Sequence, residues 1–285
     1  PPVIFLEDIQ WADDSSLDLL DYLVTVVPDM RLLVVCLARP SLFERRPSWG
    51  EGQEIHTQIN LRPLSRRASR ALVGEILQKT GDVPDELRDL IVEGAEGNPF
   101  YVEELIKMLI EDGVILVGED HWSVELERLA EVRVPPTLTG ILQARLDSLP
   151  PGEKTVLQRA SAVGRLFWGA VVAELAGDKA EAAQVDKLLN DLRGRELIFQ
   201  RERSVFETTD EYIFKHALLR DVTYETVLLK LRRVYHAQVA QWLESTAGER
   251  IGEYLGLIAG HYEANRGTAT ATELPALAKG KVARD

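Results

Sequence analysis

A short apolar run that is followed at once by two carboxylates constrains the fold of this chain more than any other feature. Residues 3–6 are Val-Ile-Phe-Leu, and Glu7 and Asp8 come directly after them. Such a run is typical of a strand buried on both faces, as in a parallel sheet that helices cover. Because ligands bind at the carboxyl ends of strands in open α/β sheets, Glu7 and Asp8 are predicted to lie at a ligand-binding edge.

The next segments continue an alternation of helix and strand. A helix capped at Ser15 or Ser16 is predicted, and residues 31–38 form a second apolar run. Strand, helix and strand make a βαβ unit, whose connection should be right-handed. A third strand is predicted over 55–61, so residues 1–63 are expected to form the carboxyl-terminal part of a doubly wound sheet.

From about residue 64 the apolar spacing becomes helical. We predict a helical subdomain over 64–134, which starts with a helix capped at Ser65 and ends in a hairpin. Helices followed by two extended segments over 135–231 favour a winged helix-turn-helix. Residues 232–285 predict further helices, either the start of a TPR-like repeat array or, from Gly267, a frayed tail. The expected fold class is α/β plus mostly α.

The elements expected within these regions have approximate bounds. They are strands at 114–117, 122–124, 197–200 and 212–214, and helices at 138–148, 153–163, 167–176, 186–193, 218–229, 233–243 and 253–264.

Composition excludes several classes of protein. The formal net charge of −13 repels nucleic-acid backbones, so DNA is not expected to bind through this chain. No apolar run approaches the roughly 20 residues of a membrane-spanning helix, which favours a cytoplasmic protein without a membrane partner. The single cysteine, Cys36, lies in an apolar run and rules out an internal disulfide.

The acidic pair has two interpretations. Glu7 and Asp8 can form an acidic turn that only solvates the strand end. In P-loop ATPases, however, one carboxylate at this position holds Mg²⁺ and a neighbouring one orients the attacking water.

The stretch Phe5-Leu6-Glu7-Asp8-Ile9-Gln10-Trp11-Ala12-Asp13 strongly resembles the Walker B region of the STAND class of P-loop ATPases. That class includes the ATPase segment of soluble adenylyl cyclases and large bacterial transcription regulators. The resemblance implies metal binding by Glu7 and Asp8 and a catalytic role for Asp8.

Further motifs along residues 1–265 resemble those of the same family, and they occur in the same order as in that family. Residues 33–39 resemble the sensor strand, which implies that Arg39 lies near the terminal phosphate. Gly97-Asn98-Pro99-Phe100-Tyr101-Val102-Glu103-Glu104 is similar to the motif whose proline, here Pro99, packs on the nucleotide base. Residues 212–221 resemble the winged-helix motif whose histidine, here His216, contacts the diphosphate of ADP.

Each of these residues also has a purely structural interpretation. Asn98 and Pro99 make a good helix start by themselves. Arg39 fits an exposed charge after a strand, and His216 fits an interior histidine. His236 and His261 recur in the same family, and we expect them to pack or cap without chemistry.

The chain also departs from the family. The phosphate-binding loop Gly-x-x-x-x-Gly-Lys-[Ser/Thr] is absent, and the nearest match, Gly74 to Thr80, has Gln78 in place of its second glycine. Glu7 stands where many relatives have aspartate, and its longer side chain changes the metal geometry. ATP or ADP and Mg²⁺ are therefore expected only with an upstream P-loop segment, and we expect this stretch alone to be inactive.

The first functional hypothesis is a nucleotide-dependent regulatory switch. The intact protein would be an ATPase that controls an output domain outside this stretch, an adenylate cyclase or a transcription regulator, and a nucleotide-dependent oligomer fits the same scheme. One alternative is a winged-helix DNA-binding regulator that uses basic residues such as Arg201, Lys215 and Arg220. Another is a catalytically inactive interaction scaffold.

Overall fold

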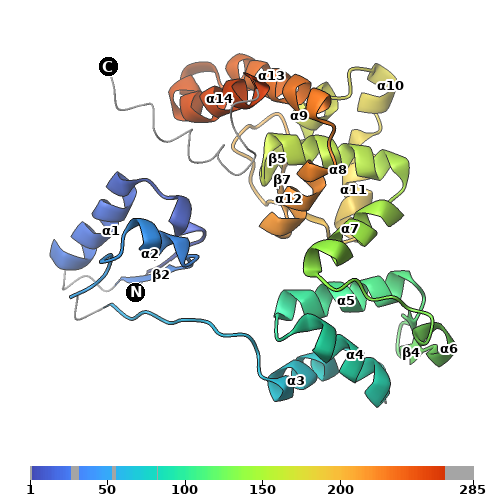
Figure 1. Ribbon diagram of the computed structural model, residues 1–285. Coiled ribbons are helices and arrows are strands. Elements are labelled where there is room, and N and C mark those ends of the chain that lie inside the picture. Colours follow the sequence, from blue (N-terminus) through green and yellow to red (C-terminus); the bar gives the residue numbers. More distant parts are fainter. Residues whose placement is uncertain (1, 27–31, 53–55, 82, 267–285) are drawn as a thin grey trace. The chain divides into compact units, whose positions relative to one another are not determined.

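The computed structural model describes residues 2–26, 32–52, 56–81 and 83–266, which are mostly helical with small sheets (Figure 1). It has two compact units: Leu61–Leu228 form one, and the described residues before and after that range form the other. Parts of the predicted elements at Arg31 and Ile55, and the tail from Gly267, lie outside the described residues. Within the described part of the chain, no helix has the length and hydropathy of a membrane span.

The first residues form the predicted strand, helix and strand. Strand β1 (Val3–Leu6) pairs in parallel with β2 (Leu33–Cys36), and α1 (Asp14–Val26) connects them. A short helix η1 (Ile9–Trp11) follows β1, and α2 (Ser41–Arg45) follows β2. Asp13, rather than Ser15 or Ser16, caps α1, because its Oδ1 accepts a 2.8 Å hydrogen bond from the backbone N–H of Ser16.

Two predictions for this region are wrong. The strands are not buried on both faces, since Val3 and Phe5 are 61% and 55% exposed. Only β1 and β2 pair among the described residues here, and the buried core is small: Ile9, Leu17 and Leu42. The predicted third strand is also absent from the described residues 56–61, where Ile59 is 75% exposed. Apolar alternation alone does not form a strand without a neighbouring strand to pair with.

The first part of the second unit is a helical layer with a hairpin. It contains α3 (Arg66–Ile76), α4 (Asp85–Ala95), α5 (Pro99–Glu111), β3 (Ile115–Leu116), β4 (Ser123–Val124) and α6 (Leu126–Leu129). The cap predicted at Ser65 is confirmed, because its hydroxyl accepts from the backbone N–H of Ala68 at 3.2 Å. Leu87, Leu105 and Leu109 are among the side chains that pack the helices together.

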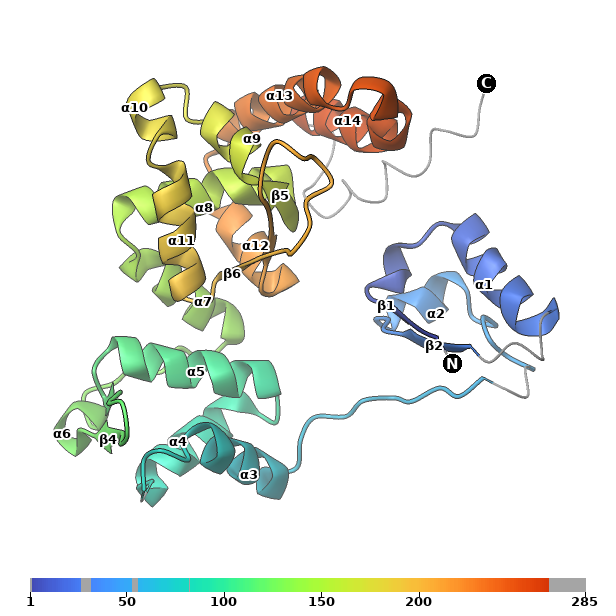
Figure 2. The same cartoon turned by 180° about the vertical axis from the view of Figure 1, so that it is seen from behind.

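The second part of this unit combines helices with a three-stranded antiparallel sheet (Figure 2). The elements are α7 (Leu138–Ser148), α8 (Pro151–Val163), β5 (Leu166–Trp168), α9 (Gly169–Glu174), α10 (Lys179–Ala182), α11 (Val185–Gly194), β6 (Ile198–Gln200), β7 (Glu211–Phe214) and α12 (Ala217–Glu225). The strand order is β5-β7-β6, so β7 is central. The helix predicted over 167–176 therefore begins as a strand, because Phe167 pairs with Tyr212 of β7.

The last described residues form a helical hairpin. Helix α13 (Leu229–Thr246) packs along α14 (Ile251–Arg266), with η2 (Gly248–Arg250) between them. His236 and His261 are buried in this pair of helices, and their Nδ1 atoms lie 2.8 Å apart. The structure thus gives both histidines a packing and hydrogen-bonding position.

Candidate functional site

One amide side chain joins Asp8, which follows β1, to the backbone of Arg39, which lies beyond β2. Gln10, which is 5% exposed, donates from Nε2 to Oδ1 of Asp8 at 3.1 Å. Its Oε1 accepts from the backbone N–H of Arg39 at 3.1 Å. Asp8 and Arg39 therefore share one edge of the β1–β2 pair, where parallel strands end.

Side chains at this edge are open to solvent to different degrees. Glu7 and Arg39 are exposed, and Asp8 is half-buried. Asp8 also has a φ of +55°, a left-handed conformation that aspartate tolerates better than most residues. No group of three or more metal-ligating side chains occurs within the described ranges, so a cation at Glu7 and Asp8 would need further oxygen ligands.

Gln10 was not among the residues predicted for this site. The only signal was a polar side chain between Ile9 and Trp11, next to a buried apolar segment. A buried amide requires hydrogen-bond partners, and here the partners come from two separate strand ends.

The Gly-Asn-Pro motif builds the start of α5. Oδ1 of Asn98 accepts from the backbone N–H groups of Phe100 and Tyr101 at 3.0 and 3.3 Å, and Pro99 takes the first helical position. Gly97 has a φ of +80°, and a Cβ there would lie 2.5 Å from the carbonyl oxygen of Leu64. The motif is therefore a helix start, as its structural interpretation predicted, and it leaves the ring of Pro99 exposed.

His216 lies against this motif although it is distant in the sequence. The imidazole and the Phe100 ring have centroids 3.6 Å apart, with their planes tilted by 38°. Nε2 of His216 is buried and has no hydrogen-bond partner in the described part of the chain. Burial lowers the pKa of His216, although Glu104 opposes that change, so the neutral ring is favoured. The resemblance implied that Pro99 and His216 contact one nucleotide, but nothing in the sequence predicted that the ring of Phe100 lies on His216.

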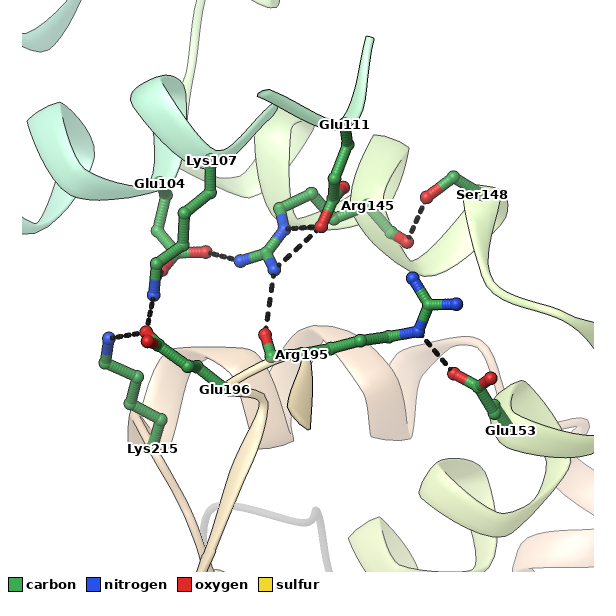
Figure 3. A network of polar contacts seen from close by, with 9 residues as sticks. All are labelled: Glu104, Lys107, Glu111, Arg145, Ser148, Glu153, Arg195, Glu196 and Lys215. Atoms are coloured by element: carbon green, nitrogen blue, oxygen red, sulfur yellow. Dashed lines mark hydrogen bonds and ion pairs between the residues drawn. The ribbon is translucent and has the colours of Figure 1, made fainter. Parts of the chain in front are cut away.

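A network of charged groups links α5 with α7 and with Lys215, the residue before His216 (Figure 3). Arg145 of α7 is 3% exposed and pairs with Glu104 and Glu111 of α5, with Glu111 at 3.1 Å. Its Nη2 also donates to the carbonyl oxygen of Arg195 at 3.3 Å. Removing one partner of a buried ion pair typically costs about 3–5 kcal/mol, so this network is a strong structural constraint.

Two lysines complete the network. Oε2 of Glu196 accepts from Nζ of Lys107 at 2.6 Å and from Nζ of Lys215 at 3.2 Å. Hydrogen bonding from Lys107 lowers the pKa of Glu196, while burial lowers the pKa of Lys107. Arg145 was missed as a site residue, although one signal existed: it takes an apolar position of its helix, beside the buried Ile141 and Leu142.

A small cavity lies beside the same motif. Its volume is about 260 Å³, and its lining residues are Leu64, Arg66, Ser69, Val92, Glu93, Glu96 and Gly97. The cavity is smaller than the roughly 300–1,000 Å³ of typical small-molecule sites, so it has room for only part of a ligand.

Comparisons with known proteins give similarities of three kinds. A family model described as a domain of unknown function (DUF8739) matches residues 65–123. An uncharacterised protein of Rhizobium meliloti (strain 1021) is 24% identical over 279 residues, which cover 90% of this chain and 25% of that protein. The chain thus spans about a quarter of the length of this curated relative. A solved structure of the Aeropyrum pernix Orc1 protein in complex with DNA covers 79% of this chain and 64% of that chain, with 14% identity and a TM-score of 0.34.

Proposed function

We propose that this chain is part of a nucleotide-dependent regulatory switch of the STAND class, in which bound ADP holds a closed state. The observation that carries the proposal is the contact between Phe100 and His216, whose ring centroids are 3.6 Å apart. The Gly-Asn-Pro-Phe motif and the histidine motif each resemble a segment that contacts the same nucleotide. Their convergence from distant parts of the sequence is what a shared ligand requires.

The chemistry around His216 fits an anionic ligand. A buried ring nitrogen without a protein partner is uncommon, and a phosphate oxygen would satisfy its N–H. Pro99 is exposed at the start of α5, where its ring is open to apolar contact with a base. The N-terminus of this 13-residue helix also favours negative charge.

By the same resemblance, the carboxylate edge of the β1–β2 pair is the candidate metal site. Glu7 and Asp8 would hold Mg²⁺ together with phosphate oxygens, since Mg²⁺ commonly uses only one or two carboxylates. Bound Mg²⁺ would neutralise charge on the phosphates. Asp8, held by Gln10, would orient water, and Arg39 would face the terminal phosphate.

The complete protein is proposed to hold two further parts. One is a P-loop segment, which the resemblance to STAND ATPases implies and whose Gly-x-x-x-x-Gly-Lys-[Ser/Thr] sequence this chain does not contain. The other is an output domain, an adenylate cyclase or a transcription regulator, which agrees with a relative about four times as long as the stretch it shares.

Calorimetric titration of the complete protein with ADP tests the proposal. His216→Ala is expected to weaken ADP binding roughly 10- to 100-fold, as loss of a hydrogen bond to a charged group predicts. His121→Ala, at an exposed position in the hairpin loop, is the matched control and should leave the affinity unchanged. Equal ADP affinities for wild type and His216→Ala would rule out the site. If no form binds ADP, the result favours the alternative of a catalytically inactive interaction scaffold.

Several contacts disfavour the DNA-binding alternative. Arg201 pairs with the buried Glu211 at 2.7 Å, and Lys215 pairs with Glu196 at 3.2 Å. Arg220 is 6% exposed and donates to a backbone carbonyl. These basic side chains are engaged within the protein, so they offer few contacts to phosphates. Salt-dependent binding of the chain to duplex DNA would reverse this conclusion.

A further inference from the structure

One face of α5 carries both the ring that contacts His216 and the ionic network. Phe100, Glu104, Lys107 and Glu111 are separated by four, three and four positions, which places them along one side of the helix. Phe100 lies on His216, while the other three enter the network (Figure 3). The rotation of α5 about its axis therefore sets the ring contact and the ion pairs together.

Arg145 is the group that holds this face. It pairs with Glu104 and Glu111, which are two turns apart on α5, and its Nη2 binds the carbonyl oxygen of Arg195. A guanidinium is planar and rigid, so binding of three acceptors restricts both the sliding and the rotation of α5.

The same network extends to the residue beside His216. Glu196, in a left-handed conformation with a φ of +56°, binds Lys107 of α5 and Lys215. Lys215 directly precedes His216 in the chain. The two partners of the ring contact, α5 and the end of β7, are thus held by one connected set of charges.

We propose that Arg145 is a positioning residue for His216, which it keeps in contact with Phe100 by holding the charged face of α5. Arg145 lies outside every motif that suggested the nucleotide site. The consequence for ADP binding rests on the proposed function, whereas the effect on His216 itself does not.

Removal of Arg145 also changes the charges that His216 faces. Those charges are Glu103, Glu104 and Lys107 on α5, and Lys215 at the end of β7. Without Arg145, the negative charge of Glu104 is less compensated, and it favours the protonated imidazole. The pKa of His216 should then rise, which is the opposite of the effect of burial.

The test uses the 285-residue chain with ¹³C-labelled histidines, followed by NMR across a pH series. His216→Gln assigns the signal, and Phe100→Leu measures the ring-current shift that Phe100 gives it. Arg145→Met should raise the titration midpoint of His216 by about half to one pH unit and remove most of that ring-current shift. Arg193→Met, at an exposed arginine on α11, is the matched control and should change neither property.

A second variant is needed because Arg145→Met leaves the buried Glu104 without its ion-pair partner, which can destabilise the fold. Glu104→Gln with Arg145→Met leaves no unpaired buried charge at these two positions, so the chain should stay folded by circular dichroism. Its His216 midpoint should lie below that of Arg145→Met, because the charge of Glu104 is also removed, while the ring-current shift should still be lost. An unchanged ring-current shift in this folded double variant would overturn the positioning role.

ADP titration of the complete protein separates this inference from the proposed function. If ADP binds and His216→Ala weakens binding, the double variant should weaken it about tenfold as well. If wild type binds no ADP but the NMR changes appear, the proposed function fails and the positioning role stands. If His216→Ala weakens binding and the double variant does not, the positioning role fails.

Discussion

The backbone N–H of Arg39 donates a 3.1 Å hydrogen bond to Oε1 of Gln10, and the same amide donates to Asp8. This relationship joins the ends of two strands that are separated by a helix in the sequence. It also leaves the guanidinium of Arg39 exposed. A single buried side chain thus organises the edge to which the proposed Mg²⁺ and phosphate contacts are assigned.

Gln10→Leu should remove the hydrogen bonds that link Asp8 to Arg39. The substitution removes the part-buried hydrogen bond of the Arg39 N–H, a loss of about 0.5–1.5 kcal/mol. Hydrogen exchange at the Arg39 amide should accelerate several-fold, while Gln78→Leu, at an exposed position, should leave it unchanged. Equal protection of the Arg39 amide in wild type and Gln10→Leu would show that the bond contributes little.

Gly97→Ala should destabilise the second unit. The residue has a left-handed φ, and its new Cβ would lie 2.5 Å from a backbone oxygen. We expect a loss of about 1–3 kcal/mol in the free energy of unfolding, measured by urea titration. Gly74→Ala is the matched control, because Gly74 lies within α3 with open space around it and should gain up to about 1 kcal/mol.

The lowered pKa of Glu196 predicts a loss of stability in acid. A carboxyl group whose pKa is lower in the folded state contributes stability above its unfolded pKa of about 4.3. That contribution disappears as the pH falls through the folded pKa. Glu196→Gln should therefore be less stable than wild type at pH 6, and the difference should shrink towards pH 3. A constant difference across that range would contradict the assignment of the ion pairs to Glu196.

The histidine pair in the last hairpin should behave as a coupled unit. With Nδ1 atoms 2.8 Å apart, one ring must donate and the other must accept. His236→Phe or His261→Phe alone should lower the free energy of unfolding by roughly 1–3 kcal/mol, since each removes the hydrogen-bond partner of a buried nitrogen on the other ring. A double-mutant cycle by urea unfolding should give a coupling energy above about 0.5 kcal/mol, and additive effects would show that the rings are independent.

Several helices and caps were predicted from the sequence because the interactions that form them lie within a few residues of each other. Helix α7 occupies the residues that apolar spacing predicted, and Ser65 and Asn98 cap their helices as their positions implied. A cap bonds to residues two or three positions away, so neighbouring side chains are sufficient to predict it. The Gly-Asn-Pro motif and His216 were likewise visible as separate segments.

Contacts between distant segments were decided only by the tertiary structure. Residues 166–168 became a strand because β7 offered a pairing partner, whereas 56–61 remained irregular without one. Arg145 is a charge at an apolar position, and only the approach of Glu104 and Glu111 makes its burial favourable.

The sequence by itself therefore determined most of the helices, the caps at Ser65 and Asn98, and the identity of the candidate groups, since these depend on short-range hydrogen bonds and periodicity. The fold alone decided that Gln10 links Asp8 to Arg39 and that Phe100 lies on His216. Such pairings depend on how whole helices and strands pack, because side chains from distant parts of the sequence become buried together only in the folded core.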